Sequence, residues 1–234
     1  MSTTNKYNNI FLIAATEREQ AGFLNLHFGN LKLMDRRDKG DLIIFVYGDE
    51  KIKKAEIKDH HEERGIQDLI IPYKENYITL SEKTVKGIQY CVSNFNFNYV
   101  YKADITKVIE IDYLDLDKEE REDFIGISAI RPRKDKWGGF THLGIIRECT
   151  PCARRVFRRW ASKRDLKVHD WLYDDAVYYS GWKPYGLSRK FAEIVARYGD
   201  AYSKLYIESF AGCEDHMIGK IWKDFSISHE LTMR

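Results

Sequence analysis

The sequence of 234 residues has few prolines, few cysteines and no long hydrophobic run, and each shortage excludes a class of protein. With 4 prolines and 44% hydrophobic residues, the composition is globular and not that of a disordered chain. Four cysteines in a chain of this size do not indicate the framework of a small secreted disulfide-rich protein. The apolar run at residues 10–15 is too short for a membrane span or for the core of a signal peptide. We therefore expect a cytoplasmic protein with reduced thiols.

Short apolar runs alternate with helical patterns along the chain, without internal repeats, and this alternation predicts an α/β fold. The expected strands are residues 10–15, 42–47, 68–71, 98–103 and 108–111. The expected helices are residues 50–64, 78–93, 188–199 (with Ser188 as N-cap and an end near Gly199) and 214–223. The strand runs are continuously apolar, which is typical of strands covered on both faces, so we expect a mixed, mostly parallel sheet flanked by helices. The length favours one domain over residues 1–234.

The net charge of +2 hides an uneven distribution of charge along the chain. Residues 131–167 carry twelve Lys and Arg against three acids, whereas residues 110–123 carry eight acids against two basic residues. The basic block is expected to be a loop and helix insertion that either forms a solvated surface or contacts phosphates of a small ligand or a nucleic acid. Its candidate contact residues, with one tryptophan further on, are Arg131, Arg133, Lys134, Trp137, Arg154, Arg155, Arg158 and Trp182.

Four short motifs follow one another at residues 75–84 (ENYITLSEKT), 99–106 (YVYKADIT), 178–188 (YYSG then YGLS) and 214–219 (EDHMIG). Together they resemble the β-1,3-galactosyltransferase and fringe family of glycosyltransferases. The matching positions are Tyr77, Leu80, Lys83, Thr84, Lys102, Asp104, Gly181, Tyr185, Leu187, Ser188, Glu214, Asp215 and Gly219. The resemblance implies the Rossmann-like GT-A fold.

The resemblance also implies an activity: inverting transfer of a sugar from a nucleotide sugar, such as a UDP-sugar, to an acceptor hydroxyl. Asp104 follows a predicted buried strand, at the edge where α/β folds bind ligands. By the resemblance it helps to hold a divalent metal, Mn or Mg, that offsets the charge of the leaving diphosphate. Thr106 and His229 are the other expected ligands. Asp215 is the expected base for the acceptor proton, with Glu214 beside it at the start of a helix.

The remaining expected donor contacts are Thr16, Arg18, Lys83, Lys102 and Gly181. The sequence departs from the family in several respects. His216 stands where the family has valine, and the gap between Gly181 and Tyr185 is one residue longer than usual. Residues 104–106 are Asp-Ile-Thr where the family has three acids, the family's N-terminal motif is replaced by Thr16 and Arg18, and the membrane anchor of the Golgi members is missing. The acceptor is then either a glycan or a hydroxymethylated base in viral or phage DNA, which such an enzyme flips out of the duplex.

Other interpretations of these residues stay open. Asp104 fits a turn cap, Glu214 and Asp215 fit ordinary acids of a first helical turn, and His229 fits a packing role. Residues 115–117 (DLD) are a rival metal motif within an acidic run, and residues 149–152 (CTPC) are a lone candidate for zinc. The degenerate acidic motif also allows a different class of protein, a non-catalytic nucleic-acid-binding protein on a decayed transferase fold.

Overall fold

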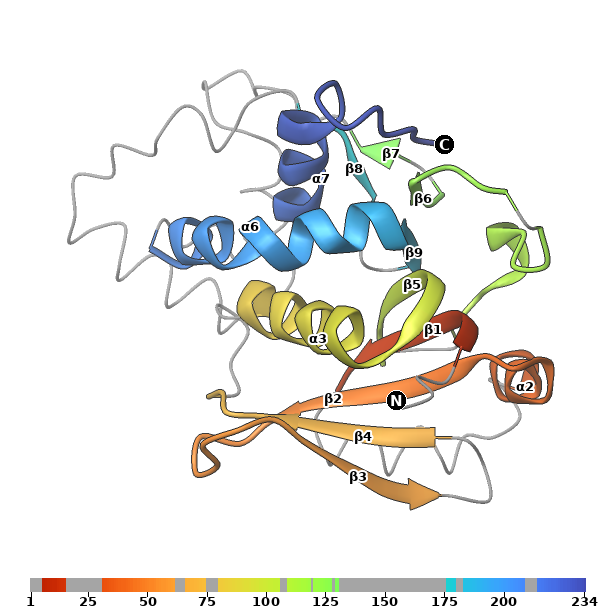
Figure 1. The fold of residues 1–234 in the computed structure, drawn as a ribbon, viewed down its shortest axis with the longest axis vertical. Coiled ribbons are helices and arrows are strands. Elements are labelled where there is room, and N and C mark those ends of the chain that lie inside the picture. Colours follow the sequence, from red (N-terminus) through yellow and green to blue (C-terminus); the bar gives the residue numbers. More distant parts are fainter. Residues whose placement is uncertain are drawn as a thin grey trace, which may run out of the picture.

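The computed structural model describes residues 6–15, 31–61, 66–74, 80–105, 109–118, 120–127, 129–130, 176–179, 183–208 and 214–234. The strands are β1 (Lys6–Ala14), β2 (Leu42–Gly48), β3 (Glu56–His61), β4 (Ile66–Ile71), β5 (Asn96–Asp104), β6 (Phe124–Ile125), β7 (Ala129–Ile130), β8 (Tyr178–Tyr179) and β9 (Tyr185–Ser188). The α-helices are α2 (Leu31–Asp35), α3 (Leu80–Asn94), α6 (Arg189–Glu208) and α7 (Glu214–Phe225). Two short 3-10 helices, η2 (Arg36–Lys39) and η5 (Asp112–Leu114), complete these elements (Figure 1).

Seven strands form one sheet in the order β3-β4-β2-β1-β5-β9-β6, and β7 pairs with β8 in a second sheet. The α/β prediction is therefore confirmed. The four strands β4, β2, β1 and β5 are mutually parallel, while the other three pairings of the large sheet are antiparallel. The expectation of a mostly parallel sheet thus holds only for the centre.

The direction of strand addition reverses between β1 and β5. From β1 the chain adds β2 and then β4 on one side, and β5 then pairs with β1 on the other side. Numbered along the chain, the four parallel strands follow the order 3-2-1-4 of nucleotide-binding α/β sheets, whose ligands bind where this order reverses. At that point the last pair in register is Ala14 and Asp104.

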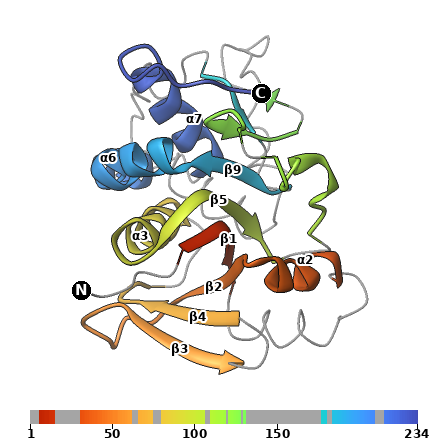
Figure 2. The ribbon, with the colours of Figure 1, turned by 45° about the vertical axis from the view of Figure 1, so that its right-hand side comes forward.

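Each face of the large sheet has its own core, because the central strands are apolar on both faces. On one face, alternate residues such as Leu12 and Ile44 pack under α3, α6 and α7. On the other face, Phe11 and Phe45 pack under Leu33 of α2 and under residues 109–116 (Figure 2). Helices and chain segments therefore cover both faces, as predicted.

Four expected strands are confirmed, and a fifth is wrong. Residues 10–15, 42–47, 68–71 and 98–103 fall largely within β1, β2, β4 and β5. Of the run 108–111, the described residues 109–111 are not a strand, although Ile109 and Ile111 are buried. They cover the face of the sheet without pairing with it, so their apolar character reflects burial and not strand structure.

The helix expected at residues 50–64 is also wrong, because residues 56–61 form the edge strand β3, antiparallel to β4. The helices expected at residues 78–93 and 214–223 are confirmed as α3 and α7. Ser188 caps α6 as predicted, since its Oγ accepts a bond of 3.2 Å from the Phe191 N–H.

The expected end of α6 near Gly199 is wrong, because the helix continues to Glu208. A Cβ at Gly199 would lie 2.8 Å from Val85 on α3, so the glycine permits close packing of two helices instead of ending one. Within the described part of the chain, no helix combines the length and the hydrophobicity that crossing a bilayer requires. The basic insertion at residues 131–167 and the cysteines at residues 149–152 lie outside the described residues.

Candidate functional site

Polar side chains from two elements, β5 and α7, meet at the carboxyl edge of the sheet, where the strand order reverses. Lys102 and Asp104 lie at the end of β5, two residues apart and thus on one face of the strand. Glu214 and Asp215 form the first turn of α7. We call these four residues the edge cluster. It stands where α/β folds of this strand order bind their ligands.

The ammonium of Lys102 is the centre of the edge cluster. Its Nζ lies 2.8 Å from Asp104 Oδ1 and 3.8 Å from Asp215 Oδ1, and it donates a hydrogen bond to Glu214 Oε1. The Lys102 side chain is 2% exposed, whereas that of Asp104 is 27% exposed. Three carboxylates therefore surround one buried cation, and Asp104 is the member most open to solvent.

Close packing of α7 sets the position of Glu214 and Asp215. A Cβ at Gly219 would lie 2.5 Å from the Val177 carbonyl oxygen and 2.6 Å from Tyr178 Cβ, so only glycine lets α7 approach β8 this closely. His216 is buried in the first turn, with its Nδ1 2.6 Å from the hydroxyl of Tyr206 on α6. The start of the helix is thus fixed from both sides.

Burial and mutual charge give the members of the edge cluster different proton affinities. Burial alone would lower the pKa of Lys102, but the three carboxylates hold that pKa well above its ordinary value. Burial would raise the pKa of Glu214, but the charge of Lys102 and hydrogen bonds from Asp215 and Lys102 together outweigh it, and the pKa lies below the usual range. Burial, together with the charge of Glu214, raises the pKa of Asp215 well above that of an ordinary aspartate. Burial also raises the pKa of Asp104 against the opposing charge of Lys102. Glu214 is thus the stable anion, and Asp215 is the acid that holds its proton most strongly.

Lys83 lies beside the edge cluster. It comes from the first turns of α3, and its Nζ donates a bond of 2.7 Å to the carbonyl oxygen of Ala15, directly after β1. This bond fixes the start of α3 to the carboxyl end of β1. Lys83 is only 3% exposed, so it stabilises this edge of the sheet as a buried residue.

Five of the residues expected in the site are brought together: Lys83, Lys102, Asp104, Glu214 and Asp215. His229 is not among them. It follows the C-terminal end of α7, with its Nδ1 2.8 Å from Ser228 Oγ and its ring against Phe225. The helix between them, about 18 Å long, separates His229 from Glu214. Several expected residues lie outside the described residues: Thr16, Arg18, Thr106, Arg131, Arg133, Lys134, Trp137, Arg154, Arg155, Arg158, Gly181 and Trp182.

The described residues of the edge cluster do not fit a divalent metal held by several carboxylates. One oxygen of Asp104 and one of Glu214 already accept from Lys102, and His229 is remote. Among the described residues, no three His, Cys, Asp or Glu side chains are arranged to hold a metal ion.

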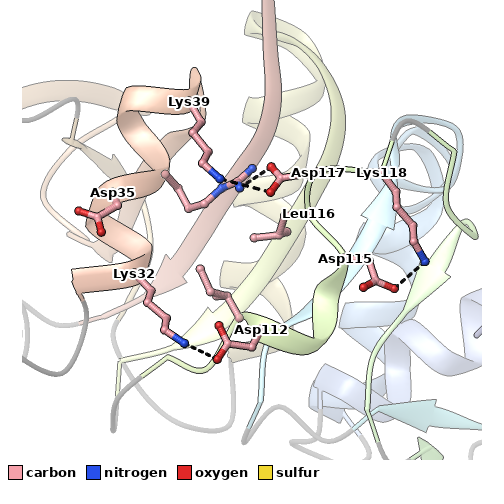
Figure 3. A pocket seen from close by; sticks show the side chains of 10 residues that line it. Lys32, Asp35, Lys39, Asp112, Asp115, Leu116, Asp117 and Lys118 are labelled. Carbon is pink, nitrogen blue, oxygen red and sulfur yellow. Dashed lines mark hydrogen bonds and ion pairs between the residues drawn. The ribbon is translucent and has the colours of Figure 1, made fainter.

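The rival motif at residues 115–117 lies along a groove of about 640 Å³ between α2, η2 and residues 111–118 (Figure 3). Its two carboxylates diverge. Asp115 pairs with Lys118 and Arg234, and Asp117 pairs with Arg36 and Lys39. Each aspartate pKa is lowered by hydrogen bonds from these cations. Both carboxylates are thus engaged by separate cations and do not form a metal pair.

Tyr185, which the sequence analysis gives only as a matching motif position, belongs to the site. It starts β9 opposite Lys102, and its ring centroid lies 5.8 Å from Lys102 Nζ. Its hydroxyl is buried without a hydrogen-bond partner among the described residues. The YGLS motif marked this position, but the unpaired hydroxyl depends on the pairing of β9 with β5.

Comparison of the sequence with models of known protein families gives no match, and comparison with curated proteins gives none either. The edge cluster and its position in the sheet are therefore the basis for inferring a function.

Proposed function

We propose that this chain is an inverting glycosyltransferase that moves a sugar from a nucleotide-sugar donor, such as a UDP-sugar, to an acceptor hydroxyl. One observation carries the proposal. Lys102 and Glu214 come from motifs 112 residues apart in the sequence, yet they are hydrogen-bonded at the carboxyl edge of the sheet. This edge lies where the 3-2-1-4 order reverses, which is the nucleotide-binding position of such sheets.

Asp215 is the proposed base. In the transfer, the acceptor oxygen forms a bond to the anomeric carbon, the bond to the nucleoside diphosphate breaks, and the acceptor proton passes to Asp215. Burial and the charge of Glu214 raise the pKa of Asp215, so its carboxylate takes up a proton more readily than that of an ordinary aspartate. Glu214 is held by Lys102 and fixes the start of α7 beside it.

The donor is proposed to lie beside Asp104, the most exposed member of the edge cluster. Its phosphates are proposed to extend toward the segment after β1, which contains Thr16 and Arg18. The acceptor is a glycan or a hydroxymethylated base of viral or phage DNA, for which the basic residues 131–167 would supply backbone contacts.

A thermal-shift screen of nucleotide sugars tests the class directly, because a ligand that binds the folded state raises the melting temperature. We expect one donor to stabilise the protein. Hydrolysis or transfer of that donor should then be lost in Asp215→Asn and kept in the control Asp224→Asn, which alters an exposed acid near the other end of α7.

Two results would contradict the proposal. The first is turnover by Asp215→Asn at the rate of the wild type. The second is a screen without any stabilising donor, combined with binding of duplex DNA. That combination would favour a non-catalytic nucleic-acid-binding protein.

A further inference from the structure

Lys102 occupies the position that a metal ion would need in order to use the carboxylates of the edge cluster together. A lysine ammonium has three N–H donors. Here it faces three carboxylates, with the oxygens of Asp104 and Asp215 at 2.8 and 3.8 Å from Nζ. A divalent ion would have to contact the same oxygens at about 2.0–2.6 Å. The two cations cannot share this space.

The ammonium is also held firmly in place. The Lys102 side chain is 2% exposed, and its surroundings are two strands, β5 and β9, and the start of α7. Its Nζ contacts Asp104, Glu214 and Asp215 from this fixed position. A metal ion would therefore meet a fixed positive charge at the point where the carboxylates converge.

We propose that Lys102 is the resident cation of this site and excludes divalent metal ions from the space between Asp104, Glu214 and Asp215. The carboxylates then need no metal to be stable in their buried positions. For the glycosyltransferase proposed above, the consequence is turnover that persists in the presence of EDTA. Only this consequence rests on the proposed function, since metal binding is measured on the free protein.

The test is a Mn²⁺ titration of the full chain, followed by the electron paramagnetic resonance signal of free Mn²⁺. We expect no stoichiometric binding to the wild type. As placed around Lys102, the three carboxylates do not form a metal site. Lys102→Ala removes the cation and lets Asp104, Glu214 and Asp215 turn into the space it leaves, so it should bind Mn²⁺ about tenfold or more tightly than the wild type. The double variant Lys102→Ala with Asp104→Asn should lose this gain.

Lys83→Ala is the matched control, because it removes a second buried lysine at the same edge whose Nζ bonds to a backbone carbonyl. It should not create a Mn²⁺ site. A wild type that binds one Mn²⁺ tightly, and loses it in Asp104→Asn, would overturn the inference. This measurement decides the question even if Lys102→Ala fails to fold. Mn²⁺ binding that survives Asp104→Asn would place the ion elsewhere and agree with the inference.

Discussion

Replacement of Lys102 by methionine tests how much stability the buried cation provides. Methionine keeps the length and much of the apolar volume of the side chain but leaves Asp104, Glu214 and Asp215 buried together without a positive charge. Removal of one partner from a buried ion pair costs about 3–5 kcal/mol, because the remaining charge has no compensation. In a domain of this size each kcal/mol lowers the melting temperature by about 2–4 °C. Lys102→Met should therefore melt roughly 6–20 °C below the wild type at neutral pH.

The loss should depend on pH in a defined direction. In the wild type, Lys102 holds the pKa of Glu214 below its ordinary value. The stability from this pairing is complete above the ordinary glutamate pKa and is lost as the pH falls through the lower folded value. In Lys102→Met, the repulsion between the three buried carboxylates decreases when they bind protons. The difference between the two proteins should therefore shrink from about pH 7.5 to about pH 4.5.

The assay is thermal unfolding followed by circular dichroism at both pH values. Lys83→Met is the control, since Lys83 bonds to the Ala15 carbonyl and affects the pKa of Asp104 less than Lys102 does. Its loss of stability should vary less with pH. A deficit of Lys102→Met that stays the same at both pH values, or lies below about 1 kcal/mol, would refute the reasoning.

Three further substitutions test the elements around the edge cluster. Asp215→Asn should raise the melting temperature at neutral pH, because the raised pKa of Asp215 means that its ionised form destabilises the fold as the pH increases. The gain should vanish near the ordinary aspartate pKa. Calorimetry across this pH range that finds a constant loss of stability would contradict this prediction. Gly219→Ala places a Cβ 2.5 Å from the Val177 carbonyl oxygen and should lower the free energy of unfolding, measured in urea, by about 1–3 kcal/mol. If alanine, the better helix former, stabilised the protein instead, α7 would not be tightly packed at this position. Ser188→Ala removes the cap on the Phe191 N–H and should cost about 1 kcal/mol in the same assay, where an unchanged midpoint would exclude a capping role.

The central sheet could be predicted from the sequence because its strands are buried on both faces. Residues 42–47 are apolar at every position, and β2 is correspondingly buried along nearly its whole length. The edge strand β3 (Glu56–His61) has the opposite composition, because an edge strand carries charges that discourage further pairing. In the sequence, the same charges predict a surface helix. Local composition cannot separate these two structures when the partner strand is unknown.

The residues of the site could be predicted from short motifs, but their arrangement could not. The motifs predict that Asp104 and Asp215 share a site and that Lys102 is a donor contact within it. Its place between the carboxylates depends on how α7 packs against β8 at Gly219, which is a tertiary contact without a local signal. His229 was wrongly grouped with Asp104 for the same reason, since the direction of α7 carries it to the other end.

The pairing of β5 with β9 has a consequence for synthesis of the chain on the ribosome. Lys102 and its partner Glu214 are 112 residues apart, so Glu214 emerges later by a time on the order of 10 s. Until β9 (Tyr185–Ser188) is made, in the first part of that interval, β5 has an unpaired side, which is where β9 will add. A nascent chain that stalls there presents an open strand edge and a Lys102 paired with Asp104 but not yet with Glu214 or Asp215, and is a target for chaperones or for association with other chains.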